Sequence, residues 1–200
     1  MLDLRQNPGG LLNEAVNICN VFIPKGQKVV HTKGKTKKQS YLYNTRLDPL
    51  DLEIPLAVLI NSKSASASEI VSGVMQDYDR GVLIGQKSYG KGLVQMTKPL
   101  TYNAQLKLTT AKYYVPSGRC IQALDYSHRR VDGSVGSIPD SLKSTFTTSN
   151  GRKVFDGGGV DPDIETEVVL LSSYTANLSE SGLLFEYATK YYFEHEKIAD

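Results

Sequence analysis

The run Leu56-Ala57-Val58-Leu59-Ile60 contains no polar residue and leads directly into Asn61-Ser62-Lys63-Ser64-Ala65-Ser66-Ala67-Ser68-Glu69. A short apolar run of this kind predicts a strand that is covered on both faces, as in a parallel sheet. From Ala67 onward, apolar residues recur at helical spacing as far as Met75, which predicts an amphipathic helix. The two stretches together predict a strand, a polar turn and a helix in an α/β fold.

The same alternation continues on both sides of this unit. Leu2–Arg5 has the pattern of the end of a buried strand, and a turn with two glycines separates it from a predicted helix over Leu11–Phe22. Gly81–Gly85 predicts another buried strand. Further strands are expected over 40–43, 93–97 and 106–115. Strands alternating with helices in this way indicate an α/β core with parallel strands.

Composition sets broad limits on the class of protein. Of the 200 residues, 40% are hydrophobic and 22% are charged, which excludes collagen-like and wholly disordered chains. A net charge of +2 gives no argument for nucleic acid or membrane binding. The longest apolar stretch is too short to span a membrane, and the first residues contain no signal peptide. Cys19 and Cys120 are too few for a disulfide scaffold and are expected to be two separate buried thiols.

Two regions outside the alternating pattern are less regular. Residues 26–45 are polar and rich in lysine, which fits either a nucleic-acid patch or a solvated hairpin; the absence of interleaved aromatic residues favours the hairpin. Residues 116–163 have weak periodicity and are expected to form a long irregular excursion. We therefore expect a core over 1–165 and a helical extension over 166–200, with an amphipathic helix from Leu183 to Tyr192.

The polar turn at the start of the second predicted helix is the most informative candidate site. It carries Ser62, Ser64, Ser66 and Ser68, where one serine would be enough to cap a helix. Free backbone N–H groups at a helix start can cap the helix, or they can stabilise an oxyanion. Its position after a buried strand is where active sites of α/β folds are usually found. The turn therefore fits either a cap or a nucleophile.

A catalytic serine needs a base, and histidine is the usual one. His31, His128 and His195 lie in polar segments without an acid placed to orient them, which argues against a Ser-His-Asp triad. A lysine that burial makes neutral is the alternative. Lys91 fits this role because it lies between Gly90 and Gly92, although an ordinary turn with an exposed lysine has the same pattern.

Four motifs occur together and in order. They are Asp3-Leu4-Arg5-Gln6-Asn7-Pro8-Gly9-Gly10-Leu11, Ser64-Ala65-Ser66-Ala67-Ser68-Glu69-Ile70, Ser88-Tyr89-Gly90-Lys91-Gly92-Leu93-Val94-Gln95 and Leu108-Thr109-Thr110-Ala111-Lys112-Tyr113-Tyr114. The chain resembles the carboxy-terminal processing, or tail-specific, serine protease family over residues 3–122. The segment from Gly157 to Asp163 resembles the closing motif of the same domain.

The resemblance implies a serine endopeptidase that cleaves protein substrates near their C-terminal part, with a Ser-Lys dyad on a crotonase-like α/β core of the ClpP/crotonase superfold. On the matching motifs, Ser66 is the nucleophile, Lys91 is the base and Gln95 orients the lysine. The N–H of Ala67 and that of Gly9 or Gly10 form the oxyanion hole, with Gly9 weakly favoured. The family needs no cofactor or metal.

Several features depart from the family pattern. Lys63 stands where many members carry glycine. Asp77 instead lies where some members carry an aspartate, and it is expected to be a helix-surface acid rather than a catalytic residue. Members carry an N-terminal region and a substrate-selecting PDZ domain ahead of the Asp-Leu-Arg motif, and neither precedes Asp3 here. We therefore expect this chain to be the C-terminal portion of the core and to be inactive or weakly active alone. Two copies could pair through the exposed edge at Leu2–Arg5.

The family resemblance also carries expectations about context. Protein or peptide substrates are the expected partners, with no nucleic acid, and the full-length protein is expected to be exported to the bacterial periplasm or cell envelope. Two other function classes share the expected fold: a non-catalytic ligand-binding or scaffold module, and an acyl-thioester enzyme of crotonase type. The presence of Ser66, Lys91 and Gln95 together argues against both.

Overall fold

The computed structural model describes residues 1–168 and 172–195. Contacts divide the chain into two units, Met1–Thr166 and Glu167–Asp200, which are described separately. The first unit contains two principal sheets and two helices, and it holds every candidate site residue.

A four-stranded parallel sheet follows the prediction from the apolar runs. Its order is β1-β4-β5-β12, and every neighbouring pair is parallel. The strands span Leu2–Asp3 (β1), Ala57–Ile60 (β4), Val82–Gly85 (β5) and Ile164–Glu165 (β12). Val58 and Leu83 are partners in the central pair and are fully buried, whereas the alternate residues are less buried and Val82 is 44% exposed. The expected burial of these strands on both faces is therefore not observed in this chain.

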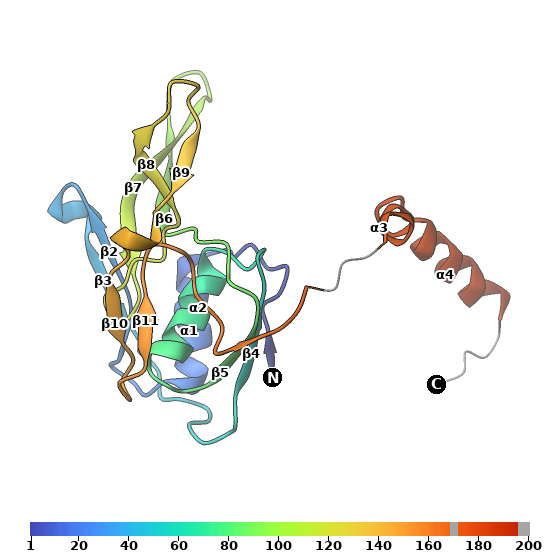
Figure 1. Cartoon of the computed structure of the whole chain (residues 1–200), viewed down its shortest axis with the longest axis horizontal. Helices are drawn as coiled ribbons and strands as arrows, with labels where there is room; N and C mark the ends of the chain where they lie inside the picture. The colour runs from blue at the N-terminus through green and yellow to red at the C-terminus, as the bar shows by residue number, and fades with distance from the viewer. Residues whose placement is uncertain (169–171, 196–200) are drawn as a thin grey trace. The chain divides into compact units, whose positions relative to one another are not determined.

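Two helices cover this sheet: α1 (Leu12–Phe22) and α2 (Ala67–Asp77). They pack against each other and against both sheets in one hydrophobic core, and Figure 1 shows them between β4–β5 and the strands around β2 and β3. Every residue of α2 is buried, so this helix is a central element of the unit. The turn that precedes it is therefore fixed on a rigid support.

A four-stranded antiparallel sheet, in the order β3-β2-β7-β6, packs on the other side of the helices. Its strands span Lys28–Gly34 (β2), Tyr41–Asn44 (β3), Leu93–Pro99 (β6) and Gln105–Tyr114 (β7), with the short helix η1 (Lys37–Gln39) between β2 and β3. The lysine-rich region is thus a hairpin, as the sequence favoured. Val29 and Val30 of β2 and Tyr113 of β7 belong to the core.

The segment 116–163, expected to be a long irregular excursion, is irregular over much of its length but also forms short strands. The segment contains two antiparallel hairpins, β8–β9 and β10–β11, whose short polar strands carry little periodicity. The elements are β8 (Leu124–Arg129), β9 (Val135–Ser137), η2 (Asp140–Leu142), β10 (Thr145–Thr147) and β11 (Lys153–Phe155). Backbone bonds from Gly157 N–H to Cys120 O and from Gly159 N–H to Ile121 O tie the segment together.

The second unit contains α3 (Ser173–Glu180) and α4 (Leu183–Glu194). The expected helix at Leu183–Tyr192 is present, but none of its residues is buried, and Phe185, Tyr187 and Phe193 are exposed. Residues 169–171 and 196–200 of the expected extension lie outside the described residues. No helix in the described part of the chain combines the length and the apolar character that a membrane span requires.

Candidate active site

Ser66 occupies an unusual backbone conformation at the junction between β4 and α2. Its φ is 56° and its ψ is −114°, a region that non-glycine residues rarely adopt and that costs about 1–3 kcal/mol. The strain is held in place because Ser66 N–H donates to Glu69 Oε2 at 2.8 Å. A serine on a strained turn between a strand and a helix has the geometry of an exposed nucleophile.

Lys91 lies in the turn that the sequence marks by its two glycines. Its backbone N–H donates to the same atom, Glu69 Oε2, at 2.9 Å. The lysine is half-buried, and none of the ion pairs in the described part of the chain involves it. A lysine without a carboxylate partner has no ion pair to stabilise its charged form.

Glu69 connects the two segments. Its carboxylate is fully buried and accepts four hydrogen bonds, because Oε1 also accepts from Ser88 Oγ at 2.5 Å and from Gly90 N–H at 2.6 Å. Burial raises the pKa of Glu69, and the four donors oppose that shift. One carboxylate therefore brings the backbone of Ser66 and that of Lys91 to a single oxygen atom.

Tyr113 makes the complementary connection through carbonyl groups. Its hydroxyl donates to Lys91 O and lies 3.2 Å from Ser66 O. Burial raises the pKa of Tyr113, as does the negative charge of Glu69, so the hydroxyl keeps its proton and remains a donor. The N–H groups of both candidate residues thus bind Glu69, and their C=O groups face Tyr113.

The Pro8-Gly9-Gly10 turn packs directly against the Ser66 turn. Gly9 has φ +86°, and a Cβ there would lie 2.6 Å from Ala67 N and 2.9 Å from Ser66 Cβ, so a side chain cannot be accommodated. Gly9 N–H donates to Asn7 Oδ1 at 2.9 Å. Within the described residues, the N–H groups of Gly10 and Ala67 have no protein acceptor. These two amides remain available as donors, and that of Ala67 directly follows Ser66.

Gln95 is exposed on β6, and the structure describes no hydrogen bond between it and Lys91. The glutamine that supports the lysine turn is Gln122, whose Oε1 accepts Gly92 N–H at 2.8 Å. Both glutamines line a pocket of about 430 Å³ together with Lys91 and Ala65. Leu93, Leu124, Tyr89 and Tyr126 contribute apolar and aromatic side chains, and the remaining lining residues are Gln6, Pro8, Lys63 and Gly90.

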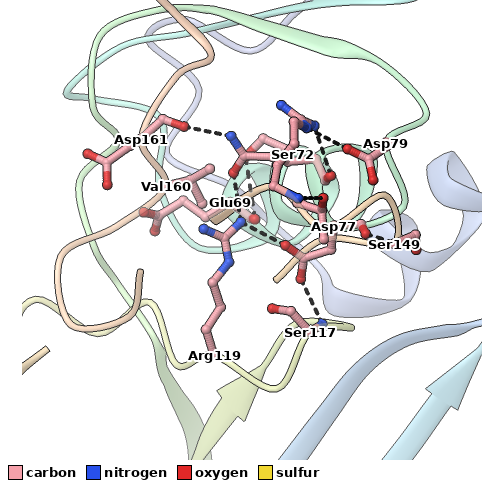
Figure 2. Close-up of polar contacts among 12 residues, drawn as sticks. Glu69, Ser72, Asp77, Asp79, Ser117, Arg119, Ser149, Val160 and Asp161 are labelled. Carbon is pink, nitrogen blue, oxygen red and sulfur yellow. Dashed lines mark hydrogen bonds and ion pairs between the residues drawn. The ribbon is translucent and has the colours of Figure 1, made fainter. Parts of the chain in front are cut away.

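The expectation that Asp77 is a surface acid was wrong. Asp77 is 3% exposed and pairs with the equally buried Arg119 at 2.9 Å, and its Oδ2 accepts Ser117 N–H at 2.8 Å (Figure 2). Burial raises its pKa, which Arg119 opposes. Arg119 also donates to Gln76 Oε1 at 2.7 Å. This network fixes the C-terminal end of α2, opposite to the end that carries Ser66.

The histidines and cysteines differ from expectation in two details, the partner of His128 and the burial of Cys120. His128 does have an acid partner, Asp125 Oδ2 at 2.6 Å from its Nδ1, but the histidine is highly exposed on β8. No histidine lines the pocket beside Lys91. The two cysteines are free thiols as expected, although Cys120 is only partly buried. Among the described residues, no group of three or more potential ligands could hold a metal ion.

Sequence reasoning assigned no role to Glu69, Tyr113 or Gln122. Glu69 carried a usable signal, because a glutamate three residues after a serine at a helix start is typical of a capping box. Tyr113 and Gln122 carried none, since their contacts depend on segments that only the tertiary fold brings together.

Known proteins resemble this chain over most of its length. Residues 1–128 match the model of peptidase family S41. The chain is 48% identical over 124 residues, 62% of its length, to a carboxy-terminal-processing protease of Bartonella bacilliformis. It is 43% identical over 187 residues, 93% of its length, to a probable CtpA-like serine protease of Staphylococcus epidermidis.

A solved structure, the photosystem II D1 C-terminal processing protease, aligns with 83% of the chain at 26% identity and a TM-score of 0.60. The chain spans only about a third of the length of these proteins, with 28%, 37% and 34% of each covered. On the family match and these relatives, the chain belongs to peptidase family S41 and is related to its carboxy-terminal-processing serine proteases.

Proposed function

We propose that Ser66 and Lys91 form the catalytic dyad of a serine endopeptidase. The observation that carries this proposal is the convergence of the two backbone N–H groups on Glu69 Oε2, at 2.8 and 2.9 Å. Through this shared acceptor, the strained Ser66 lies close to Lys91, which has no ion-pair partner among the described residues. The pocket that Lys91 lines is large enough for a side chain.

In the proposed reaction, neutral Lys91 accepts the Ser66 Oγ proton while Oγ attacks the carbonyl carbon of a peptide bond. The tetrahedral intermediate collapses, and Lys91 returns the proton to the leaving amine. Water then attacks the acyl-enzyme, with Lys91 again taking a proton, and releases the carboxylate product and free Ser66.

The oxyanion requires two donors beside Ser66. Ala67 N–H supplies one. For the second we favour Gly10 over Gly9, because Gly9 N–H is already bound to Asn7 Oδ1 whereas Gly10 N–H has no protein acceptor within the described residues. Gln95 shares the pocket with Lys91 and remains a candidate to orient it through substrate or water.

Three broader parts of the proposal rest on the family. We infer a crotonase-like core, cleavage near the C-terminal part of protein substrates, and an exported full-length protein. The 200-residue chain should degrade casein weakly or not at all, since β1 is an edge strand of the parallel sheet and the chain covers only 37% of the Staphylococcus epidermidis relative. Pairing of two copies through that edge is a further proposal.

A fluorophosphonate probe tests the dyad directly, because it reacts with an activated serine and needs no substrate-binding domain. We expect one label on Ser66 that is absent in Ser66→Ala. Lys91→Ala and Lys91→Arg should reduce labelling to background, since a guanidinium cannot act as a base at accessible pH. Ser62→Ala, an exposed serine of the same turn, is the matched control and should label normally.

A label on another serine, or labelling that persists in Lys91→Ala, would contradict the dyad. A complete absence of labelling in a folded chain would favour a non-catalytic module on the same fold.

A further inference from the structure

Two clefts next to the Lys91 turn share a wall. The first is the pocket of about 430 Å³ that Lys91 lines. The second has a volume of about 750 Å³ and lies between the antiparallel sheet and β8. The residues that line both are Leu93, Gln95, Gln122, Leu124 and Tyr126. A chain bound at the candidate dyad can therefore continue from one cleft into the other.

The second cleft is lined by positive charge. Lys33, Lys35, Lys112 and Arg129 all contribute to its wall. Among the described residues that line either cleft, Asp125 is the single acid, and it is already bound to His128. The excess is local, because the whole chain carries a net charge of only +2.

Two of these lysines lie directly opposite each other on neighbouring strands. Lys33 of β2 and Lys112 of β7 are register partners, and like charges in this position destabilise a sheet. Neither takes part in any ion pair of the described residues, and Lys33 Nζ instead lies over the ring of Tyr114, 4.7 Å from its centroid. An anionic group bound between the two would relieve this repulsion.

We propose that the second cleft binds acidic side chains of the peptide substrate, on one side of the bond to be cleaved. The proposal rests on the peptidase function proposed above, because the shared wall links the cleft to the candidate dyad. A peptide fits better than nucleic acid, since Leu93, Leu124 and Ile138 offer apolar contacts, and Tyr126 is the single aromatic residue among the described residues that line the cleft, too few for successive bases to stack on. Acidic residues near the cleavage site would then favour binding.

Binding can be measured apart from catalysis with the Ser66→Ala chain and fluorescent peptides of equal length. One peptide carries glutamates at one end, and its partner carries glutamines at the same positions. Fluorescence anisotropy should show the acidic peptide binding about three- to tenfold more tightly at low salt, which is what two or three exposed ion pairs supply. The ratio of the two affinities should approach one at about 0.5 M NaCl, because salt screens exposed charges.

The double variant Lys33→Gln/Lys112→Gln should lose most of the preference. Lys98→Gln/Lys107→Gln is the matched control, since both residues are exposed on the same sheet and neither lines a cleft. Equal binding of the two peptides, or a preference that survives in the double variant, would overturn the proposal. A single-stranded oligonucleotide that competes more strongly than the acidic peptide would also overturn it.

The result of the peptide-binding experiment can be distinguished from the test of the catalytic dyad. Fluorophosphonate labelling of unmodified Ser66 reports the nucleophile whether or not the peptides bind. Failure of labelling with an intact acidic preference would remove the catalytic proposal and leave the binding site.

Discussion

Substituting glutamine for Glu69 should uncouple the two segments of the candidate dyad with little change in side-chain shape. The carboxylate accepts four hydrogen bonds, two at each oxygen. An amide has one acceptor oxygen, so its NH₂ group must face one pair of donors. In the better orientation it faces Ser88 and Gly90; the Ser88 hydroxyl can rotate to accept, but Gly90 N–H cannot.

At least one buried donor is thus left without an acceptor, which costs about 1–3 kcal/mol of the free energy of unfolding. The two remaining bonds to Ser66 and Lys91 also lose the strength that the negative charge gives them. A displacement of about 1 Å between catalytic groups can lower a rate about 100-fold. We therefore expect Glu69→Gln to melt lower than the parent and to label with fluorophosphonate about 10- to 100-fold more slowly.

The assay is the labelling rate at a temperature where circular dichroism shows the variant to be folded. Ser72→Ala is the matched control, because Ser72 is buried one turn further along α2 and donates only a long bond of 3.4 Å to Glu69 O. Tyr113→Phe tests the carbonyl side and should slow labelling while keeping the packed ring. If Glu69→Gln labels within twofold of the parent, the carboxylate does not position the dyad.

Three further predictions follow from the same geometry. The variant Gly9→Ala should melt lower than the parent and label poorly, because Gly9 has φ +86° and a Cβ there would clash with the Ser66 turn. The variant Gly10→Ala should melt and label like the parent, because a Cβ at Gly10 meets open space. Arg119→Met should lower the free energy of unfolding by about 3–5 kcal/mol in denaturant titrations, since it leaves the buried Asp77 carboxylate unpaired; a loss below 1 kcal/mol would show that the pair is unimportant. Because burial raises the pKa of Glu69 above its ordinary value of 4.5, ionising it in the folded chain costs stability, so the free energy of unfolding should fall as pH rises from 4.5 through the native pKa, while labelling should rise as the carboxylate ionises and accepts all four donors. The amount by which the parent melts above Glu69→Gln should therefore be largest near pH 4.5 and narrow at higher pH, and a difference that does not change with pH would contradict this.

The central elements could be predicted closely because their patterns are strong. The helix expected over Leu11–Phe22 is observed over Leu12–Phe22, and the strands expected at 56–60 and 81–85 are observed at Ala57–Ile60 and Val82–Gly85. In each case burial on the inner face repeats at the period of the element, so local sequence and tertiary packing favour the same structure.

The parts of the fold and of the candidate site that the sequence did not predict depend on contacts between distant segments. The strands β10 and β11 have three residues each, too few for an alternation to be recognised. Asp77 was misjudged because its partner Arg119 lies 42 positions later in the chain, and an acid at the end of a helix is exposed unless such a partner exists. The pattern of α4 was helical, but an amphipathic period predicts a helix without showing what its apolar residues contact.

The positions of Ser66 and Lys91 are set through backbone atoms, and this determines how variants at the site should be interpreted. Glu69 accepts their N–H groups and Tyr113 faces their carbonyl groups, so neither contact involves the Ser66 hydroxyl or the Lys91 ammonium. The variants Ser66→Ala and Lys91→Ala should therefore keep the turn geometry and the parent melting temperature while they lose labelling. Glu69→Gln should change both properties together. Loss of labelling at an unchanged melting temperature thus identifies a residue that reacts, whereas loss of both identifies one that holds the reacting residues in place.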